Sequence, residues 1–511
     1  MAREFQSPTD SASVDVYPVH MFDDYKGPRS IMMQWIFRVD AQLDASKLRS
    51  ALTRVLETGD WRKLAGRLHC TVCITGGLVL LQHADLEWQK TGGLEIHVPH
   101  TFTDQDPAFT YTHRDYSTET FDDDAKRRAF PKADSGPQVY ARTPSANESV
   151  FAPGTPKTLQ EHMERGLPQL GLHISTFKDV TLIELTWPHT VMDGTGQREL
   201  LAAWSLALAD REHEIKPLAG AREDVAWHIA GQYTDEQIYP NVVRDRELTG
   251  FRKLFFFCRL FWRHLTGPRA DWRIFYLPKP VIRTWREDVF QLPTGSKTDE
   301  HPFVSDGDLI CAWLVSLAAV GRHPSTRYVI AGSFNCRARI PALRDAPGVY
   351  MQNLLGLYFA SITPDDVAGP SSSLARIALA HRAEVAAQTT ESQVLHHFQR
   401  RRNAAETQRE PGMPFYCRSD EVPVLCNNLA GLRIGAAADF GPAVVVAGTG
   451  GPVASGRVVS HHYLSTDDKN RPVPYFICLD QDEGGYWIRG NASAQTWDKI
   501  IREIGTVDAD V

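Results

Sequence analysis

Residues 187–196 read WPHTVMDGTG, and this stretch decides how the rest of the chain is interpreted. The residues before it favour a β-strand, and residues 197–209 after it have the pattern of a helix. Catalytic groups are often carried by loops that two rigid elements hold in place. His189, at the end of the expected strand, can present a ring nitrogen to a cleft and act as a general base near neutral pH.

Asp193 follows His189 by four residues, and its role has two interpretations. In a catalytic loop the carboxylate turns inward and fixes the loop through an ion pair, while Gly194 lets the backbone bend back. Alternatively, His189 only ends the strand and Asp193 caps the N-terminus of the next helix. The spacing H-x-x-x-D does not decide between them, because it also occurs by chance.

The elements on either side of this stretch form two similar blocks. Strands and helices are mixed in both blocks, which predicts an α/β protein of two lobes. We expect an N-terminal lobe at 1–210, a crossover linker at 211–300 and a C-terminal lobe at 301–511. Within the first block we expect a strand at 31–39, a helix capped by Asp44, long loops at 101–165 and a hairpin at 171–186. Within the second we expect a helix capped by Ser305, helices at 373–388 and 496–504, and strands at 328–336, 353–362, 422–429, 442–447 and 474–479.

Composition narrows the class of protein. The chain has 511 residues, 42% of them hydrophobic, which is enough for a large core and excludes disorder as the default state. Its net charge of −7 gives no electrostatic reason to bind nucleic acid. No apolar run reaches the ~18 residues of a membrane span, and the polar N-terminal segment predicts no secretory signal. With eight cysteines, we expect reduced thiols in a cytoplasmic protein.

The cysteines and paired histidines do not form a metal motif. Cys70 and Cys73 make a C-x-x-C on an apolar strand, where residues i and i+3 face opposite sides. No second pair follows at zinc spacing, so we predict buried structural cysteines and no metal site. His461 and His462 lie in a polar segment that turn-forming residues follow, and a catalytic role there is disfavoured.

Residues 189–194 resemble the H-x-x-x-D-G signature of the BAHD acyltransferases and of the wider chloramphenicol-acetyltransferase-like superfamily. The second family signature, D-F-G-W-G, is matched in part by Asp439-Phe440-Gly441, where Pro442 replaces the tryptophan. Shorter matches span nearly the whole chain: LAGRL at 64–68, SDGDLICAW at 305–313, and FNCRARIPAL at 334–343 followed by Tyr350 and Asn353. The length and the segment 101–165 look most like the fungal secondary-metabolism branch.

The resemblance implies a fold and a reaction. Two lobes would enclose a channel with the histidine at its middle, which acyl-CoA and an acceptor alcohol or amine would enter from opposite faces. No cofactor would be bound permanently, and acetyl would be the default acyl group. His189 would take the proton of the acceptor and return it to the CoA thiolate. The enzyme would act as a cytoplasmic monomer.

The resemblance also assigns supporting residues. Asp193 would point away from the channel and pair with an arginine of the second lobe, for which Arg337 matches best and Arg339 is the fallback. Asp439 would begin a structural turn remote from the reacting atoms.

Three further residues are candidates for the channel. Asn427 and Asn428 lie where relatives place a channel-lining strand, and an amide there could donate to the oxyanion or to the pantetheine arm. Edge-strand or turn asparagines are the favoured alternative. Ser305, at the start of the segment SDGDLICAW, is the third candidate.

Other interpretations stay open at this point. A condensation-type enzyme with a carrier-bound acyl group usually has a doubled histidine, whereas Pro188 precedes His189 here. A non-catalytic binding relative would explain the altered second signature. The aromatic residues of the crossover, at 255–257, 261 and 262, allow a bulky hydrophobic substrate or a lipid-surface contact. We favour ordinary packing of a helix onto a lobe.

Overall fold

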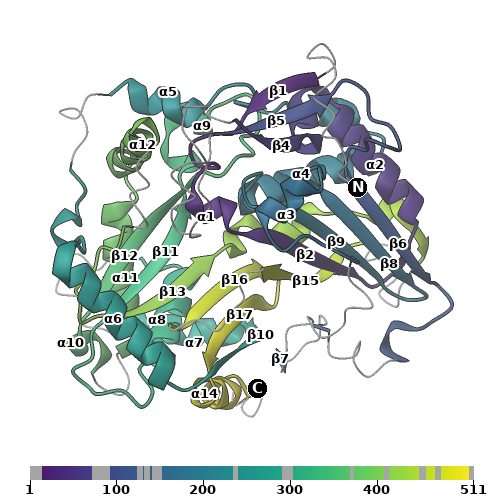
Figure 1. The fold of residues 1–511 in the computed structure, drawn as a ribbon. Helices are drawn as coiled ribbons and strands as arrows, with labels where there is room; N and C mark the ends of the chain where they lie inside the picture. Colours follow the sequence, from purple (N-terminus) through teal and green to yellow (C-terminus); the bar gives the residue numbers. More distant parts are fainter. Residues whose placement is uncertain are drawn as a thin grey trace, which may run out of the picture.

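The chain folds into two α/β lobes that lie side by side, as the sequence predicted (Figure 1). The computed structural model describes residues 14–71, 93–123, 130–131, 138–140, 152–233, 240–290, 303–368, 373–407, 414–447, 456–465 and 473–505.

A five-stranded sheet forms the centre of the first lobe, in the order β15-β2-β9-β8-β6. Nearly all residues of its middle strands are buried, so both faces of the sheet are covered. The central pair is the expected hairpin, whose turn is closed by the Phe177 amide donating to the Val180 carbonyl at 2.7 Å. The strands are β2 (Met32–Val39), β6 (Thr110–Tyr116), β8 (Gly171–Phe177), β9 (Thr181–Pro188) and β15 (Val458–Ser465).

Two helices of the first lobe, α2 (Ala45–Glu57) and α4 (Gly194–Leu208), pack on each other and share one hydrophobic core with this sheet. Asp44 caps α2 as expected, because its carboxylate accepts the amides of Ser46 and Lys47. The indole of Trp204 on α4 donates to the Leu48 carbonyl on α2 at 2.9 Å. The helix that begins at the H-x-x-x-D loop is therefore anchored in the core.

A seven-stranded sheet forms the centre of the second lobe, in the order β12-β11-β13-β16-β17-β10-β7. Helix α8, which begins after the Ser305 capping box, is buried over almost its whole length, as its apolar pattern indicated. The strands are β7 (Gln138–Tyr140), β10 (Ala270–Pro278), β11 (Tyr328–Asn335), β12 (Leu355–Ile362), β13 (Val422–Asn428), β16 (Tyr475–Gln481) and β17 (Gly485–Ser493). Helices α7 (Lys279–Phe290), α8 (Asp306–Ala318), α11 (Ser373–Gln388) and α14 (Ala494–Gly505) share its core.

The boundaries expected from the sequence do not coincide with the two sheets. Strand β10 lies in the expected linker, yet it pairs with β17 along all nine of its residues. Strand β7 comes from the expected N-terminal lobe but joins the sheet of the second lobe. Conversely, β15 comes from the C-terminal lobe and joins the sheet of the first lobe. This exchange of β7 and β15 between the sheets joins the two lobes. It could not be predicted from the sequence, because these strands lack a clear apolar alternation.

Three smaller expectations need correction. The segment 101–165 was expected to be loops, but it contains β6 and the short helix α3 (Leu159–Glu164), and β6 pairs with β8 in parallel. Cys70 is exposed rather than buried, and Cys73 lies outside the described residues. His461 and His462 are buried on β15, where the sequence suggested a polar segment.

Two small sheets and several helices complete the structure. The sheets are β1 (Val14–Pro18), β5 (Leu94–Pro99) and β4 (Arg67–Cys70), and β14 (Val444–Val446) with β3 (Gln42–Leu43). The remaining helices are α1 (Lys26–Arg29), α5 (Val225–Gly231), α6 (Gly250–Thr266), α9 (Pro341–Arg344), α10 (Pro364–Val367), α12 (Glu391–Glu406) and α13 (Ile434–Ala437). Within the described part of the chain, no helix is long and apolar enough to cross a membrane.

Candidate active site

His189 is the first residue after β9, and its backbone is held on both sides. Its amide donates to the Ile31 carbonyl at 2.9 Å, and its carbonyl accepts the side-chain amide of Asn353 at 2.6 Å. The side chain is half-buried, and its Nδ1 atom is buried without a hydrogen-bond partner among the described residues. The backbone is therefore fixed by both lobes, while the ring keeps its hydrogen-bonding capacity.

Burial lowers the pKa of His189 below its ordinary value of 6.5, because the charged imidazolium loses hydration. The backbone carbonyl of His189, the charge of Asp193 and the contact with Asn353 act in the opposite direction on this pKa, but they do not outweigh burial. The ring is thus mainly neutral at pH 7. A neutral imidazole is the form that can accept a proton.

We expect the acid limb of the pH–rate profile to reflect this lowered pKa. A histidine base loses activity as the pH falls through its pKa, so the midpoint of this limb should lie below pH 6.5. The measurement is kcat/KM for acyl transfer as a function of pH, with a donor and acceptor that do not titrate in this range. A midpoint above 6.5 would contradict a buried, neutral His189 as the base.

Asp193 combines the two roles that the sequence left as alternatives. Its Oδ1 atom accepts the backbone amides of Thr195 at 2.9 Å and Gly196 at 3.2 Å, which caps α4. The same carboxylate accepts two hydrogen bonds from Arg337, at 3.0 and 3.1 Å, and a third from the Leu354 amide at 3.1 Å. Asp193 is buried, so the loop end is fixed by a charge that solvent does not reach.

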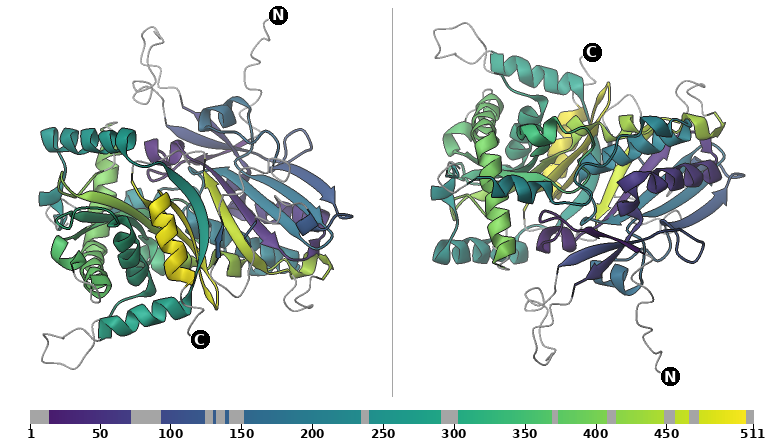
Figure 2. Two further views of the ribbon diagram at one scale, coloured as in Figure 1. Left: turned by 90° about the horizontal axis from the view of Figure 1, so that it is seen from below. Right: turned by 90° about the horizontal axis from the view of Figure 1, so that it is seen from above.

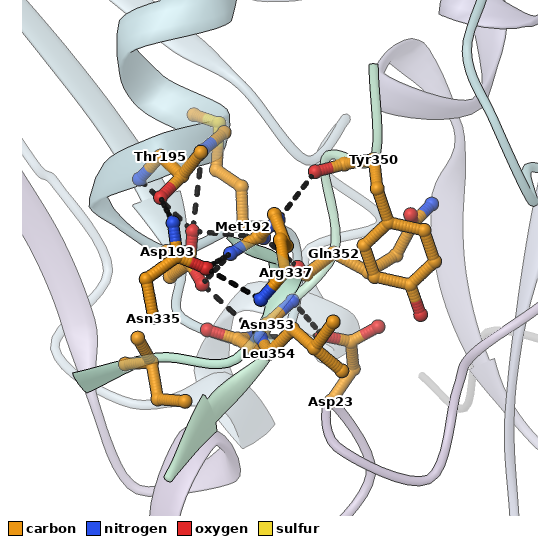
Figure 3. A network of polar contacts seen from close by, with 12 residues as sticks. Asp23, Met192, Asp193, Thr195, Asn335, Arg337, Tyr350, Gln352, Asn353 and Leu354 are labelled. Carbon is orange, nitrogen blue, oxygen red and sulfur yellow. Dashed lines mark hydrogen bonds and ion pairs between the residues drawn. The ribbon is translucent and has the colours of Figure 1, made fainter. Parts of the chain in front are cut away.

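Arg337, in the short 3-10 helix η9 (Arg337–Arg339) after β11, is the arginine that pairs with Asp193 (Figure 3). Its guanidinium also donates to the carbonyl oxygens of Tyr350, at 2.9 Å, and Gln352. This planar group with five donors suits a buried bidentate contact with a carboxylate. Arg339 is exposed, so the fallback partner is not needed.

The glycines of the loop serve close packing rather than an unusual backbone. Gly194 is not in the left-handed region, which corrects the expected bend, but a Cβ there would come within 3.0 Å of Leu432. Gly196 was not singled out in the sequence, yet a Cβ at that position would lie 2.3 Å from the Met351 carbonyl oxygen. Any larger residue at Gly196 would push the start of α4 away from the second lobe.

The sequence analysis missed the role of one buried carboxylate and of its amide partner. Asp23 accepts both the backbone amide of Asn353, at 2.8 Å, and its side-chain amide, at 2.7 Å. Burial raises the pKa of Asp23 well above its ordinary value, while the charge of Lys63 acts in the opposite direction. Asn353 thus links Asp23 to the His189 carbonyl. The adjacent carboxylates Asp23 and Asp24, just before the first long strand, were the available signal.

The structure places the three channel candidates in local contacts. Ser305 forms the α8 capping box with Asp308. The side chain of Asn427 accepts the Ser333 hydroxyl at 2.6 Å, and that of Asn428 accepts the Ala430 amide at 3.0 Å. These contacts agree with the alternative of structural asparagines, and a role in the channel stays a prediction.

Asp439 begins a turn beside the first lobe, far from His189 in the sequence. Its carboxylate accepts the Gly441 amide at 3.0 Å, and its own amide donates to the Ser205 hydroxyl on α4 at 2.8 Å. The following Phe440 is buried edge-on against Trp204, with ring centroids 5.2 Å apart. This local geometry supports the far part of α4, and Pro442 fits the 3-10 helix η11 (Gly441–Ala443) that follows.

Comparisons with known proteins agree with this architecture, although no established family model matches the chain. The O-acetyltransferase PaAT-2 of Phomopsis amygdali is 29% identical over 503 residues, which cover 96% of this chain and 97% of the relative. The acetyltransferase sphE of Aspergillus fumigatus is 32% identical over 380 residues, 71% of this chain and 69% of the relative. F. sporotrichioides TRI101, solved with coenzyme A and T-2, superposes with a TM-score of 0.64 at 15% identity and covers 97% of this chain and 98% of that chain.

The two lobes joined at an H-x-x-x-D loop define an enzyme with the chloramphenicol-acetyltransferase-like fold. The chain belongs to the family of fungal acetyltransferases that includes sphE. It is an acyltransferase, as the resemblance in the sequence implied.

Proposed function

We propose that this enzyme transfers an acetyl group from acetyl-CoA to a hydroxyl group of a secondary metabolite, with His189 as the general base. The observation that carries the proposal is the position of His189: a neutral ring at the end of β9, on a loop that the second lobe holds through Arg337 and Asn353. Relatives named acetyltransferases and O-acetyltransferases support acetyl as the acyl group and oxygen as the acceptor atom.

The chemistry needs one base and no covalent enzyme intermediate. His189 removes the proton of the acceptor hydroxyl while the oxygen attacks the thioester carbonyl, and a tetrahedral oxyanion forms. When the oxyanion collapses, the C–S bond breaks and the imidazolium returns the proton to the CoA thiolate. The products are the acetyl ester and free CoA. Holding both substrates beside one base supplies much of the rate, because it replaces a collision in solution by an oriented reaction.

Asp193 and Arg337 act as positioning residues in this proposal. The carboxylate of Asp193 accepts hydrogen bonds from Arg337 and from the backbone amides of α4. It is therefore not free to orient the imidazole ring as the aspartate of a hydrolase triad does. Its charge acts on the pKa of His189, whereas its effect on the position of His189 is carried by the backbone of the loop.

Asn353→Ala should lower kcat by ~10-fold to 10²-fold, because a displacement of the base by about 1 Å is enough for a loss of that size. The variant removes the donor to the His189 carbonyl and one partner of Asp23. The KM for acetyl-CoA should change little, since the proposal places no contact between Asn353 and the donor. Asn403→Ala, an exposed asparagine on α12, is the matched control and should behave as wild type. A normal kcat for Asn353→Ala would show that the loop is held without this contact.

Release of free CoA, together with the mass of the product, tests the proposed function. The purified enzyme is supplied with acetyl-CoA, longer acyl-CoA donors or an acyl group on a carrier protein, and with a panel of alcohols and amines. We expect acetyl-CoA to be preferred and CoA release to depend on His189. Preference for the carrier-bound donor would favour a condensation-type enzyme, for which the residue before His189 gives no support. Binding of CoA without His189-dependent turnover would favour a non-catalytic relative.

We further infer that the enzyme works as a monomer in the cytoplasm. The cysteines of the described residues are free thiols, which suits a reducing compartment. Light scattering of the purified protein and fractionation of cells that produce it test the two statements separately.

A further inference from the structure

Helix α6 turns its most apolar side chains away from the protein. It lies on the outside of the second lobe, and both views in Figure 2 place it at the edge of the molecule. Phe251 is 89% exposed and Trp262 66%, and the other large apolar residues that point outward are Leu254, Phe255, Phe257, Phe261 and Leu265. The favoured expectation from the sequence, that these aromatics pack onto the lobe, holds for Phe256 and in part for Phe257, whose ring lies edge-on against Phe415 with centroids 5.5 Å apart; it is wrong for Phe255, Phe261 and Trp262.

The inward face of α6 is fixed by specific contacts, so the helix cannot roll to bury its aromatic face. Phe256 is fully buried and packs on Phe415, with ring centroids 5.6 Å apart. Arg259, three residues on, donates to the backbone carbonyls of Asp420 and Glu421. Residues three apart lie on the same side of a helix, and this side faces the protein. The opposite side of α6, which carries the exposed aromatic residues, therefore faces away from the protein.

The charges of α6 are of one sign. Residues 250–270 contain five Lys or Arg residues and no Asp or Glu. Among the described residues, none of the cationic side chains of α6 forms an ion pair with a carboxylate; these are Arg252, Lys253, Arg259, Arg263 and His264. At 100° per residue the exposed apolar residues occupy one continuous arc. Lys253 and His264 lie along one border of this arc and Arg252 lies beyond the other, whereas Arg259 is held against the protein.

A further cation, Arg322, adjoins the C-terminal end of the helix. Arg263 and His264 line a hollow of about 310 Å³ together with Arg322, which precedes β11. Burial and the charges of Arg322 and Arg259 lower the pKa of Arg263 to about 10. These guanidinium groups repel one another, and an anion beside them would relieve the repulsion.

An exposed apolar arc with cationic borders has three possible occupants. A second copy packed face to face on α6 would bring the two sets of cations together, which like-charge repulsion disfavours. A protein partner would need acidic residues around an apolar groove, and nothing in the chain indicates one. A lipid surface with anionic headgroups satisfies both features at once, because acyl chains cover the aromatic rings and phosphates meet the cations.

We propose that α6 docks the enzyme on anionic lipid membranes. The helix lies flat in the interface, with Phe251, Phe261 and Trp262 among the acyl chains and with the cations of its borders at the headgroups. Seventeen residues give a contact line of roughly 25 Å. The inference is independent of the transfer chemistry, since it concerns a surface on the outside of one lobe.

Co-sedimentation of the full-length enzyme with vesicles tests this proposal. We expect binding to phosphatidylcholine vesicles that contain about 30% phosphatidylserine, and at least ~10-fold weaker binding to phosphatidylcholine alone. Binding should weaken on going from about 0.1 M to about 1 M salt, because salt screens the headgroup charges. Arg252→Gln with Lys253→Gln should reduce the preference for phosphatidylserine while leaving the aromatic face intact.

The decisive variant replaces two adjacent exposed rings, Phe261→Asp with Trp262→Asp, and should lower vesicle binding at least ~10-fold. The matched control is Val445→Asp with Val446→Asp, which makes the same charge change at two adjacent exposed residues of β14 on the other lobe. Equal binding by the two double variants would overturn the proposal, as would absence of binding by the wild type. A wild-type dimer that the α6 double variant converts to a monomer would also overturn it, because a second copy would then cover the helix. Melting temperatures near that of the wild type confirm that both variants are folded.

Discussion

His189→Ala is expected to lower kcat by at least ~10²-fold, the low end of what a positioned general base provides. The KM for acetyl-CoA should stay close to the wild-type value, because the proposed role of the ring is to accept the acceptor proton. The measurement is initial-rate release of CoA at saturating donor and acceptor. The residual activity should lack the acid limb that the ring of His189 produces in the wild type.

The structure indicates that this variant will fold, so the rate can be interpreted. The contacts that hold residue 189 are made by its backbone, with Ile31 and Asn353, and alanine retains both. The Nδ1 atom has no hydrogen-bond partner among the described residues, so its removal leaves no described partner unsatisfied. Near-normal turnover in a protein with the wild-type melting temperature would exclude His189 as the base.

Local signals in the sequence were sufficient for much of the fold. Asp44 and Ser305 cap α2 and α8 as expected, since a cap depends on residues within three positions of one another. The strand exchange between the lobes could not be found in this way. Strand β15 joins β2 across more than 400 residues of chain, and its histidines read as polar although they are buried. Pairing at that distance is decided by tertiary packing rather than by local preference.

In the active site too, residues close together in the sequence could be predicted and contacts between distant residues could not. The loop from His189 to Asp193 could be marked from its spacing, and the resemblance supplied Arg337. For Asp23 the available signal was the pair of adjacent carboxylates at 23 and 24, which does not reveal its contact with Asn353, 330 positions further along the chain. Helix α6 shows a different limit: its pattern is amphipathic, and a pattern alone does not tell whether the apolar face turns to the protein or to a membrane.

The ion pair between Asp193 and Arg337 should show strong energetic coupling. Asp193 belongs to the loop before α4 in the first lobe, and Arg337 follows β11 in the second, so the pair joins the lobes at the active site (Figure 3). Both side chains are buried. Removing one charge leaves the other buried without a partner, which lowers the free energy of unfolding by about 3–5 kcal/mol. Removing both charges avoids that penalty. The double variant should therefore lose less stability than the sum of the single variants.

A double-mutant cycle of Asp193→Asn and Arg337→Met measures this coupling through the free energy of unfolding in urea. Asparagine is also a good N-cap, so Asp193→Asn removes the charge while retaining a cap for α4. Arg339→Met is the matched control: Arg339 is exposed two residues further on, and its loss should change stability by less than about 0.5 kcal/mol. A coupling energy below about 0.5 kcal/mol would show that Asp193 and Arg337 act independently. If Asp193→Asn keeps the wild-type stability and loses only kcat, the carboxylate acts on the reacting groups themselves, and its role as a tie between the lobes is wrong.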